Sequence, residues 1–272
     1  MEPNILKEIF EKRKADLKSM ELYYDTLAES TTYRRKTIKQ QIHLNQKNKT
    51  KSELFLITEL KPKSPSKGVL IDSDEINPVA ISVDMENSGS SAISVLTEPH
   101  YFGGSYAMLK LVTQTVKIPV LMKDFVFHPI QIRIAKKLGA SNVLLITGYS
   151  DLDDLLRECK KLEVEPLIEI HNKEDIDIII QYKDYIKEIG VIGINNRDLR
   201  TLSIDLNTSK RLVPELRNEF GKDTPIISES GFQNFSEIME FHRLGVDGFL
   251  IGSSIMQSGN IGQKIRELRG VA

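Results

Sequence analysis

Cysteine, long apolar runs and an excess of charge of one sign are all nearly absent from this chain. The one cysteine, Cys159, has no partner for an intramolecular disulfide, and it lies in a charged helical stretch without metal-ligand spacing. The chain therefore excludes a disulfide framework and predicts no metal centre. Such a chain suits a reducing cytoplasm.

The charges balance almost completely, with 37 basic and 38 acidic residues and a formal net charge of -1. No global field draws such a protein toward nucleic acid or a lipid surface, so any anion site must be local. No apolar run approaches about 18 residues, and residues 1–30 contain no apolar core of the signal-peptide type. We therefore expect no nucleic-acid partner and no membrane association.

Short runs rich in β-branched residues recur along the chain and alternate with stretches of helical periodicity. The eight runs are 55–61, 91–98, 118–125, 142–147, 165–170, 189–196, 224–230 and 247–254. Helical periodicity is clearest over 105–116, 128–139, 151–162, 207–220 and 234–245. Because the runs are nearly continuously apolar, they predict a parallel sheet buried on both faces.

The fold class that fits this alternation is α/β, a (β/α)8 TIM barrel. An open, doubly wound sheet would also fit, but each run ends in polar residues or glycine, which favours closure. The 272 residues match the roughly 250 that such a barrel uses, and no linker divides them, so we expect one domain over 1–272. Residues 1–49 are expected to form an N-terminal helical extension, with helices over 5–20 and 31–43. A frayed basic tail is the alternative.

Polar side chains stand at the ends of most predicted strands, where a barrel brings distant residues into one mouth. Glu59 and Lys61 lie two positions apart on the first strand and therefore face the same side. Ser64, Ser66, Lys67 and Gly68 follow them. The remaining strand-end groups are Lys123, Asp124, Glu169, Asn195, Arg197, Glu229, Ser230, Gly231, Gly252, Ser253 and Ser254. Apolar surroundings are expected to shift Lys123 and Glu169 toward titration near neutral pH, as acid-base catalysis requires. A structural ion-pair network would show the same pattern.

The last two strands end in ESGF and IGSS, where small residues let phosphate oxygens approach backbone N–H groups. Glycines that only make tight turns are the alternative for either loop. His100 and His128 lack a second imidazole at ligand spacing and are not expected to bind metal. Phe102 and Phe125 are candidates for an aromatic substrate wall or for packing alone.

With these residues at its strand ends, the chain resembles the indole-3-glycerol phosphate synthase family. The matching stretches follow one another in the family's order over nearly the whole chain, although each alone is weak. They are ILKEIFEKRKADL, TELKPKSPSKGVL, AISVLTEPHYFGGS, IPVLMKDFVFHPIQI, PLIEIHN, IGINNRDLRTL, ISESGF and GFLIGSSIM. The resemblance implies a carboxy-lyase of tryptophan biosynthesis without metal or redox cofactor. It would convert 1-(o-carboxyphenylamino)-1-deoxyribulose 5-phosphate to indole-3-glycerol phosphate, carbon dioxide and water.

The resemblance also implies roles for individual residues. Lys123 matches the general acid, Glu169 the carboxylate of the later dehydration, and Lys61 the second catalytic lysine, while the division of labour between the lysines stays open. Supporting catalytic positions match Glu59, Asn195, Glu229 and Ser230. Substrate-binding positions match Arg197 near the anthranilate end, Ser64, Gly231, Gly252 and Ser253 at the phosphate, and Phe102 and Phe125 at the ring. The N-terminal helices match an extension over the barrel mouth.

Two segments depart from the family pattern: His128 replaces an acidic residue, and the loop after LLIT reads GYSD. Two other functions are alternatives. Phosphoribosyl anthranilate isomerase would need a cysteine at a strand end, whereas Cys159 falls in a predicted helix. A catalytically silent phosphate binder or assembly subunit would not need the acid-base residues. We expect a small phosphorylated substrate as the partner, and a monomer or weak homo-oligomer.

Overall fold

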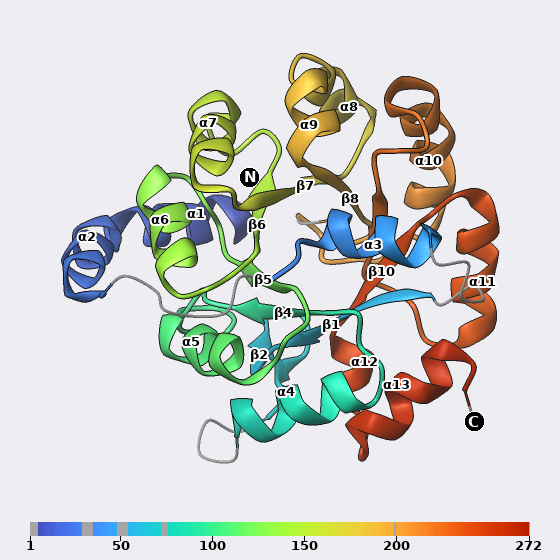
Figure 1. The fold of residues 1–272 in the computed structure, drawn as a ribbon, viewed down its shortest axis with the longest axis horizontal. Coiled ribbons are helices and arrows are strands. Elements are labelled where there is room, and N and C mark those ends of the chain that lie inside the picture. Colours follow the sequence, from blue (N-terminus) through green and yellow to red (C-terminus); the bar gives the residue numbers. More distant parts are fainter. Residues whose placement is uncertain (1–4, 29–34, 48–53, 72–75, 199, 272) are drawn as a thin grey trace.

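The structure is a computed structural model that describes residues 5–28, 35–47, 54–71, 76–198 and 200–271. Eight parallel strands close into a barrel, with each strand beside its neighbour in the sequence and the last beside the first (Figure 1). These strands are β1 (Phe55–Leu60), β4 (Ala92–Leu96), β5 (Val120–Lys123), β6 (Asn142–Ile146), β7 (Glu165–Ile170), β8 (Val191–Asn195), β9 (Ile226–Glu229) and β10 (Gly248–Ile251). Each predicted run contains one of them, so the (β/α)8 barrel is confirmed.

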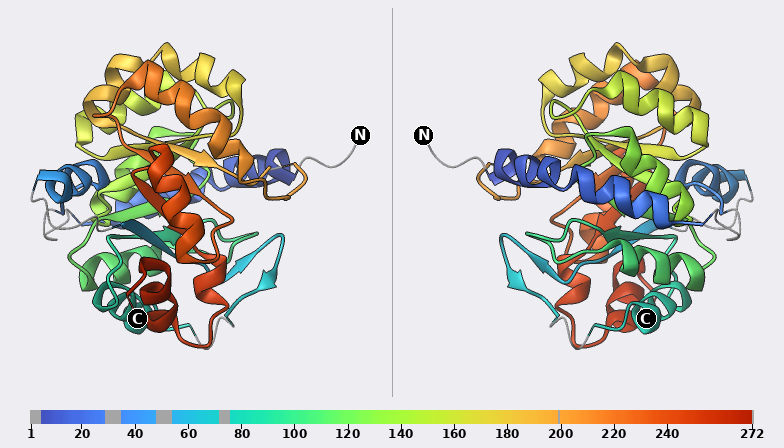
Figure 2. Two further views of the ribbon diagram at one scale, coloured as in Figure 1. Left: turned by 90° about the vertical axis from the view of Figure 1, so that its right-hand side faces the viewer. Right: turned by 90° about the vertical axis from the view of Figure 1, so that its left-hand side faces the viewer.

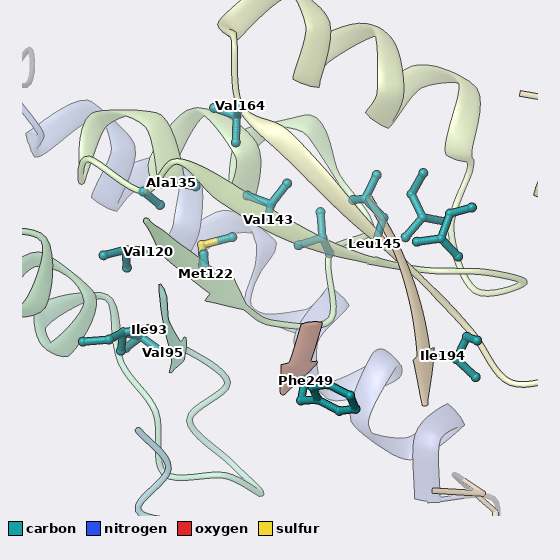
Figure 3. Close-up of a cluster of buried hydrophobic side chains, with 14 of the residues drawn as sticks. Ile93, Val95, Val120, Met122, Ala135, Val143, Leu145, Val164, Ile194 and Phe249 are labelled. Atoms are coloured by element: carbon teal, nitrogen blue, oxygen red, sulfur yellow. The ribbon is translucent and has the colours of Figure 1, made fainter. Parts of the chain in front are cut away.

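Alternating side chains of the barrel wall build two apolar clusters, because successive residues of a strand point to opposite faces. One cluster includes Ile57, Leu121 and Leu167, and these inward side chains fill the barrel. The other includes the residues next to them, such as Leu56, Met122 and Ile168. Figure 3 shows the second cluster, in which Met122 and Val143 lie near Ala135 of a surrounding helix. Buried aliphatic side chains each contribute roughly 1.5–3 kcal/mol, so these clusters dominate the stability of the barrel.

A ring of helices surrounds the strands (Figure 1). They are α4 (Pro78–Asn87), α5 (Tyr106–Thr115), α6 (Pro129–Lys137), α7 (Leu152–Leu162), α8 (Lys173–Ile180), α9 (Lys183–Ile189), α10 (Asn207–Phe220), α11 (Phe235–Leu244), α12 (Ser253–Met256) and α13 (Ile261–Arg269). A short hairpin of β2 (Lys63–Ser64) and β3 (Gly68–Val69) follows β1. Within the described ranges, no helix is long and apolar enough to cross a membrane.

The two segments that depart from the family pattern, at His128 and in the GYSD loop, each begin a helix. His128 caps α6 by accepting a hydrogen bond from the backbone N–H of Ile130 at Nδ1, 3.3 Å away, and Gln131 completes the capping box. The imidazole thus does what a carboxylate commonly does at this position. In the GYSD loop, Asp151 caps α7, and Tyr149 stacks on Phe10 with ring centroids 4.9 Å apart.

Three helices precede the barrel, namely α1 (Ile5–Ala15), α2 (Leu17–Thr26) and α3 (Ile38–Lys47). The helix predicted over 5–20 is interrupted at Asp16, whose carboxylate accepts a hydrogen bond from Arg13 at 2.8 Å and contacts His100 at 2.9 Å. The helix predicted over 31–43 begins later, and its residues 31–34 lie outside the described residues, as do 1–4, 29–30 and 48–49 of the expected extension.

Of the three described N-terminal helices, α1 covers the barrel mouth, so the predicted placement of the whole extension is corrected for α2 and α3. Helix α2 packs against α6, and Figure 2 shows α3 at the end of the barrel opposite α1. The backbone N–H of Lys39 donates to Glu165 at 2.9 Å, and that of Ile38 to Asn142 at 3.3 Å, where β7 and β6 begin. Burial raises the pKa of Glu165 to about 7 despite its hydrogen bonds. The sequence could not place α2 and α3, because an amphipathic pattern predicts which face of a helix is buried but not which element covers that face.

A buried ion pair fixes α1 to the mouth. Nε of Arg13 donates to Asp124 Oδ1 at 2.9 Å, and Nη2 donates to Oδ2 at 2.6 Å. The Arg13 side chain is 4% exposed and that of Asp124 is 0% exposed. Asp124 follows Lys123 directly and also accepts a hydrogen bond from Thr97 at 2.6 Å. The extension therefore holds the chain immediately beyond the end of β5.

Arg13→Ala is expected to lower the free energy of unfolding by about 3–5 kcal/mol, because it leaves the buried carboxylate of Asp124 without its cation. Lys14→Ala is the matched control, since Lys14 pairs with Glu11 at the surface at 3.1 Å, and it should change stability by less than about 1 kcal/mol. Equilibrium unfolding in urea measures both. Equal losses in the two variants would contradict the anchoring role of Arg13.

Candidate active site

A cavity of about 330 Å³ lies at the carboxyl ends of the barrel strands. Most of the predicted site residues line it: Glu59, Lys61, Phe102, Lys123, Phe125, Glu169, Asn195, Arg197, Ser230, Gly231, Gly252 and Ser253. Glu229 does not line the cavity but reaches Lys123 from β9. Ser64 is buried in β2 and accepts a hydrogen bond from the backbone N–H of Lys67 at 3.2 Å. The structure thus brings together all the predicted residues except Ser64.

The ammonium group of Lys123 lies among three carboxylates. Its Nζ atom is 3.1 Å from Glu229 Oε2, 3.5 Å from Glu59 Oε2 and 3.9 Å from Glu169 Oε2. The lysine comes from β5 and its partners from β9, β1 and β7, so barrel closure is what assembles the group. All three carboxylates are buried. A cation so surrounded stays charged and fixed in position.

Lys61 extends the same network from the end of β1. Its Nζ atom lies 2.7 Å from Glu59 Oε1, and the other oxygen of that carboxylate faces Lys123. Burial alone would raise the pKa of Glu59, but the two ammonium groups outweigh it and lower this pKa to about 2. Glu59 is therefore a permanent anion that holds both lysines in the cavity.

The predicted shift of Lys123 and Glu169 toward neutral pH is wrong for both groups. Burial lowers the pKa of Lys123, yet the carboxylates of Glu229, Glu59 and Glu169 raise it above its ordinary value. Burial raises the pKa of Glu169, yet His171 and Lys123 lower it below its ordinary value. Opposite charges within about 4 Å thus outweigh burial, so both groups are ionised at neutral pH.

Of the three carboxylates around Lys123, Glu229 is the one whose pKa lies near neutral pH. Burial, together with the negative charge of Glu169, raises its pKa to about 7, although Lys123 opposes this shift. Its side chain fits because residue 193 of β8 is glycine, where a Cβ atom would overlap Glu229 Oε1. No sequence pattern predicts this steric role for Gly193.

His171, just after β7, was not among the predicted site residues. Its Nε2 atom lies 3.1 Å from Glu169 Oε1, and its Nδ1 atom lies 3.6 Å from Asp175 Oδ2. Positions 169 and 171 are two apart, which places them on one side of an extended chain. This spacing from Glu169 could have identified His171 as a neighbour of the site.

Two phenylalanines form an apolar wall beside the charged groups. The ring centroids of Phe102 and Phe125 are 5.9 Å apart, and Phe10 of α1 packs edge-on against Phe125 at 5.2 Å. The buried carboxylate of Glu98, also missed by the sequence analysis, accepts the backbone N–H groups of residues 100–102 at 2.7–2.9 Å. Glu98 thereby shapes the loop that presents Phe102.

The opposite side of the cavity is built from small residues after β9 and β10. Ser230 and Gly231 have positive φ angles of 68° and 103°, and a Cβ atom on Gly231 would lie 2.7 Å from Ile204. Gly252 and Ser253 begin α12, and the first N–H groups of a helix lack partners within it. This wall is suited to an anion that accepts backbone hydrogen bonds.

Other lining residues come from loops. Lys67 adds a cation from the hairpin after β1, and Gln233, Ser254 and Gln257 add polar groups near Gly231 and Gly252. Arg197 donates to the carbonyl oxygen of Leu202 at 2.7 Å and to Ser66 Oγ at 3.3 Å, so it links two loops. Lys67 and Ser254 are among the predicted strand-end residues, in the motifs SPSKG and IGSS. The glutamines had no such signal.

Among the described residues, no three His, Cys, Asp or Glu side chains are grouped so as to hold a metal ion. Cys159 is buried in α7, where burial raises its pKa above the ordinary value, and it does not line the cavity. The cysteine chemistry considered as an alternative therefore has no thiol at this site.

Comparison with known proteins agrees with this geometry. The family model described as "Indole-3-glycerol phosphate synthase" matches residues 6–268. The chain belongs to the indole-3-glycerol phosphate synthase family. A relative of that name from Campylobacter jejuni is 37% identical over 269 residues, covering 97% of this chain and 99% of the relative. The relative of the same name from Methanocaldococcus jannaschii is 38% identical over 264 residues, covering 94% of this chain and 92% of the relative. That from Aquifex aeolicus is 40% identical over 218 residues, covering 79% and 81%.

A solved structure shares the barrel at much lower sequence identity. The phosphoribosylanthranilate isomerase of Thermotoga maritima superposes with a TM-score of 0.55 and 11% identity, covering 79% of this chain and 96% of that one. At that identity the similarity concerns the fold alone. The indole-3-glycerol phosphate synthase family, in contrast, is matched along nearly the whole chain.

Gly193→Ala is expected to displace the Glu229 carboxylate and lower the free energy of unfolding by about 1–3 kcal/mol, as overpacking of a filled interior does. Gly259→Ala is the matched control, because a Cβ atom there meets nothing within 4 Å. Urea unfolding and a crystal structure of the first variant measure the two effects. An unmoved Glu229 in a fully stable Gly193→Ala protein would show that the contact is not restrictive.

Proposed function

We propose that this chain closes the indole ring, converting 1-(o-carboxyphenylamino)-1-deoxyribulose 5-phosphate to indole-3-glycerol phosphate with loss of carbon dioxide and water. The observation that carries the proposal is the position of Lys123. Its ammonium lies among Glu59, Glu169 and Glu229, in a cavity that also has an aromatic wall and a wall of small residues. Membership of the family supports the same reaction.

In the first step the ring carbon that bears the carboxylate attacks the substrate ketone. The ketone oxygen becomes an alkoxide, and we assign its protonation to Lys123. A positioned acid of this kind accelerates a reaction by about 10²- to 10⁴-fold. Loss of carbon dioxide then returns the bonding electrons to the aromatic ring. The neighbouring carboxylates keep Lys123 charged until the alkoxide forms.

Dehydration completes the indole. The hydroxyl group leaves as water after it takes a proton from an acid, for which Lys61 and Lys123 are both in place. Glu169 is assigned as the base that removes a proton from the neighbouring carbon. The acids give one proton to the alkoxide and one to the leaving hydroxyl group, and Glu169 removes one proton from carbon. The reaction therefore consumes one proton overall. This balances the conversion of a carboxylate into neutral carbon dioxide.

The remaining residues are assigned to positioning. Glu59 and Glu229 hold the lysines, Asn195 and Ser230 face the substrate hydroxyl groups, and Arg197 serves the anthranilate end. Phe102 and Phe125 hold the aromatic ring. The phosphate is assigned to Gly231, Gly252 and Ser253, together with Lys67. Ser64 would act on the phosphate indirectly, by holding the hairpin that carries Lys67. Fixing both ends of a flexible substrate folds it into a reactive conformation.

We further propose that residues 1–272 form one domain that acts in the cytoplasm as a monomer or weak homo-oligomer. The support for one domain is that the strands of a single barrel extend from residue 55 to residue 251, with the N-terminal helices packed on it. Its partner is the small phosphorylated substrate.

Lys123→Ala should lower turnover at least about 10²-fold, measured by the fluorescence of the indole product, because the alkoxide loses its acid. Lys123→Arg keeps the charge that the carboxylates need, so it should fold normally and still turn over slowly, since a guanidinium is a poorer acid. Lys110→Ala, an exposed change on α5, is the control. Unchanged turnover in both Lys123 variants would remove this residue from the mechanism.

A further inference from the structure

His171 lies between two carboxylates at the end of β7. One neighbour is Glu169, with 3.1 Å between Nε2 and Oε1, and the other is Asp175 on α8, with 3.6 Å between Nδ1 and Oδ2. The imidazole is mostly buried, with 16% of its side chain exposed. The imidazole therefore lies at ion-pair distance from two carboxylates, and one of them is the proposed base.

The start of α8 fixes this arrangement. Asn172 caps the helix by accepting the backbone N–H of Asp175 at 2.9 Å. In return, Asp175 Oδ2 accepts the backbone N–H of His171 at 2.7 Å. Because the same carboxylate oxygen contacts both the backbone and the ring of His171, the imidazole has little freedom to turn away from Glu169.

Glu169 and His171 line different cavities. Glu169 lines the active-site cavity, whereas His171 and Asp175 line a larger hollow of about 690 Å³. Asn195 and Arg197 line both spaces. His171 thus supports Glu169 from behind, on the side away from the place assigned to the substrate.

Charged groups from several elements face this pair. On the active-site side Glu169 meets Lys123 of β5, and its negative charge also acts on Glu229 of β9, whose pKa it raises. The hollow on the His171 side is lined by Glu174 and Asp175 of α8, by Arg197, Asp198, Arg200 and Asp205 after β8, and by Arg211 of α10. Both signs are represented there, so the nearest contacts of His171, which are the carboxylates of Glu169 and Asp175, set its charge.

We propose that His171 is a positioning residue for the reaction: its imidazolium holds the Glu169 carboxylate ionised and aimed into the cavity, and Asp175 holds the imidazolium in turn. This proposal rests on the proposed function, in which Glu169 is the base. Burial lowers the pKa of His171, but Asp175 and Glu169 raise it to about 9. The ring is therefore charged at neutral pH.

The sign of the pH effect follows. The imidazolium helps to keep the pKa of Glu169 below its ordinary value. Without that charge the pKa of Glu169 rises, so the base is protonated at a higher pH. The acid limb of the kcat profile then moves upward. An opposite charge at this distance commonly shifts a pKa by about 1–3 units.

The kinetic test compares His171→Gln and Asp175→Asn with His43→Gln, a half-buried histidine of α3 whose Nε2 atom lies 3.0 Å from the backbone carbonyl oxygen of Asp223. Figure 2 shows α3 at the far end of the barrel. His171→Gln keeps a donor but loses the charge. We expect kcat to fall about 10-fold, KM to change less than about twofold, and the acid limb to rise by at least about one pH unit. Asp175→Asn should move the same limb less, and His43→Gln should match the wild type.

A second measurement does not need turnover. NMR titration of ring-labelled histidine, assigned with His171→Gln, should give His171 a pKa of about 9 in the wild type. Glu169→Gln should lower it by at least about one unit, because it removes one of the two carboxylates. An unchanged pKa in Glu169→Gln would overturn the coupling whatever the activity.

The outcomes separate the two proposals. If the wild type turns over the substrate and His171→Gln keeps both kcat and the acid limb, the role of His171 is overturned while the proposed function stands. A folded wild-type protein that does not turn over the substrate would overturn the proposed function, and with it the role of His171 in supporting a base. A rise of the acid limb in His171→Gln, together with a lower pKa of His171 in Glu169→Gln, supports both proposals.

Discussion

The interaction on which this site depends is the contact of one buried ammonium group with three carboxylates. Removing charges from water is costly, and the cost is offset only when all the partners are present and well placed. Lys123, Glu59, Glu169 and Glu229 come from four strands, so closure of the barrel is the condition for their balance. Lys61 adds a second cation. Burial and the negative charge of Glu169 raise the pKa of Glu229 to about 7, although Lys123 opposes this shift.

This balance gives the cavity a fixed electrostatic pattern before substrate arrives. Glu59 and Glu169 are anions and Lys123 is a cation, each stabilised by the others. An alkoxide forming near Lys123 meets an ammonium that needs no rearrangement, which is the main advantage of a preorganised site. Arg13 and Asp124 extend the same logic outward, since they fix α1 beside β5 and bring Phe10 against Phe125.

The sequence was sufficient for the barrel because eight apolar runs, each followed by polar residues, leave few other arrangements. It also located most of the cavity, since residues at strand ends, such as Lys123 and Glu169, must share the mouth. It failed where tertiary packing decides. Helical spacing could not tell that α3 lies at the far end of the barrel. Motif position could not tell that Ser64 is turned toward the backbone of Lys67 instead of lining the cavity. The roles of Glu98 and His171 depend on loop geometry.

The pKa directions failed for a different reason. Burial and opposite charge act against each other on Lys123 and Glu169, and only the distances show that charge prevails. A sequence gives the residue types but not separations of 3–4 Å. Gly193 is a similar case, because its value to the site is the space it leaves for Glu229.

The most direct test of the account is a crystal structure with a substrate analogue whose ketone is reduced to an alcohol. The account predicts that the alcohol oxygen lies within about 3.2 Å of Lys123 Nζ. The phosphate should lie against Gly231 and Ser253, and the ring between Phe102 and Phe125. An alcohol oxygen out of reach of Lys123, with the analogue otherwise ordered in the cavity, would contradict the central claim.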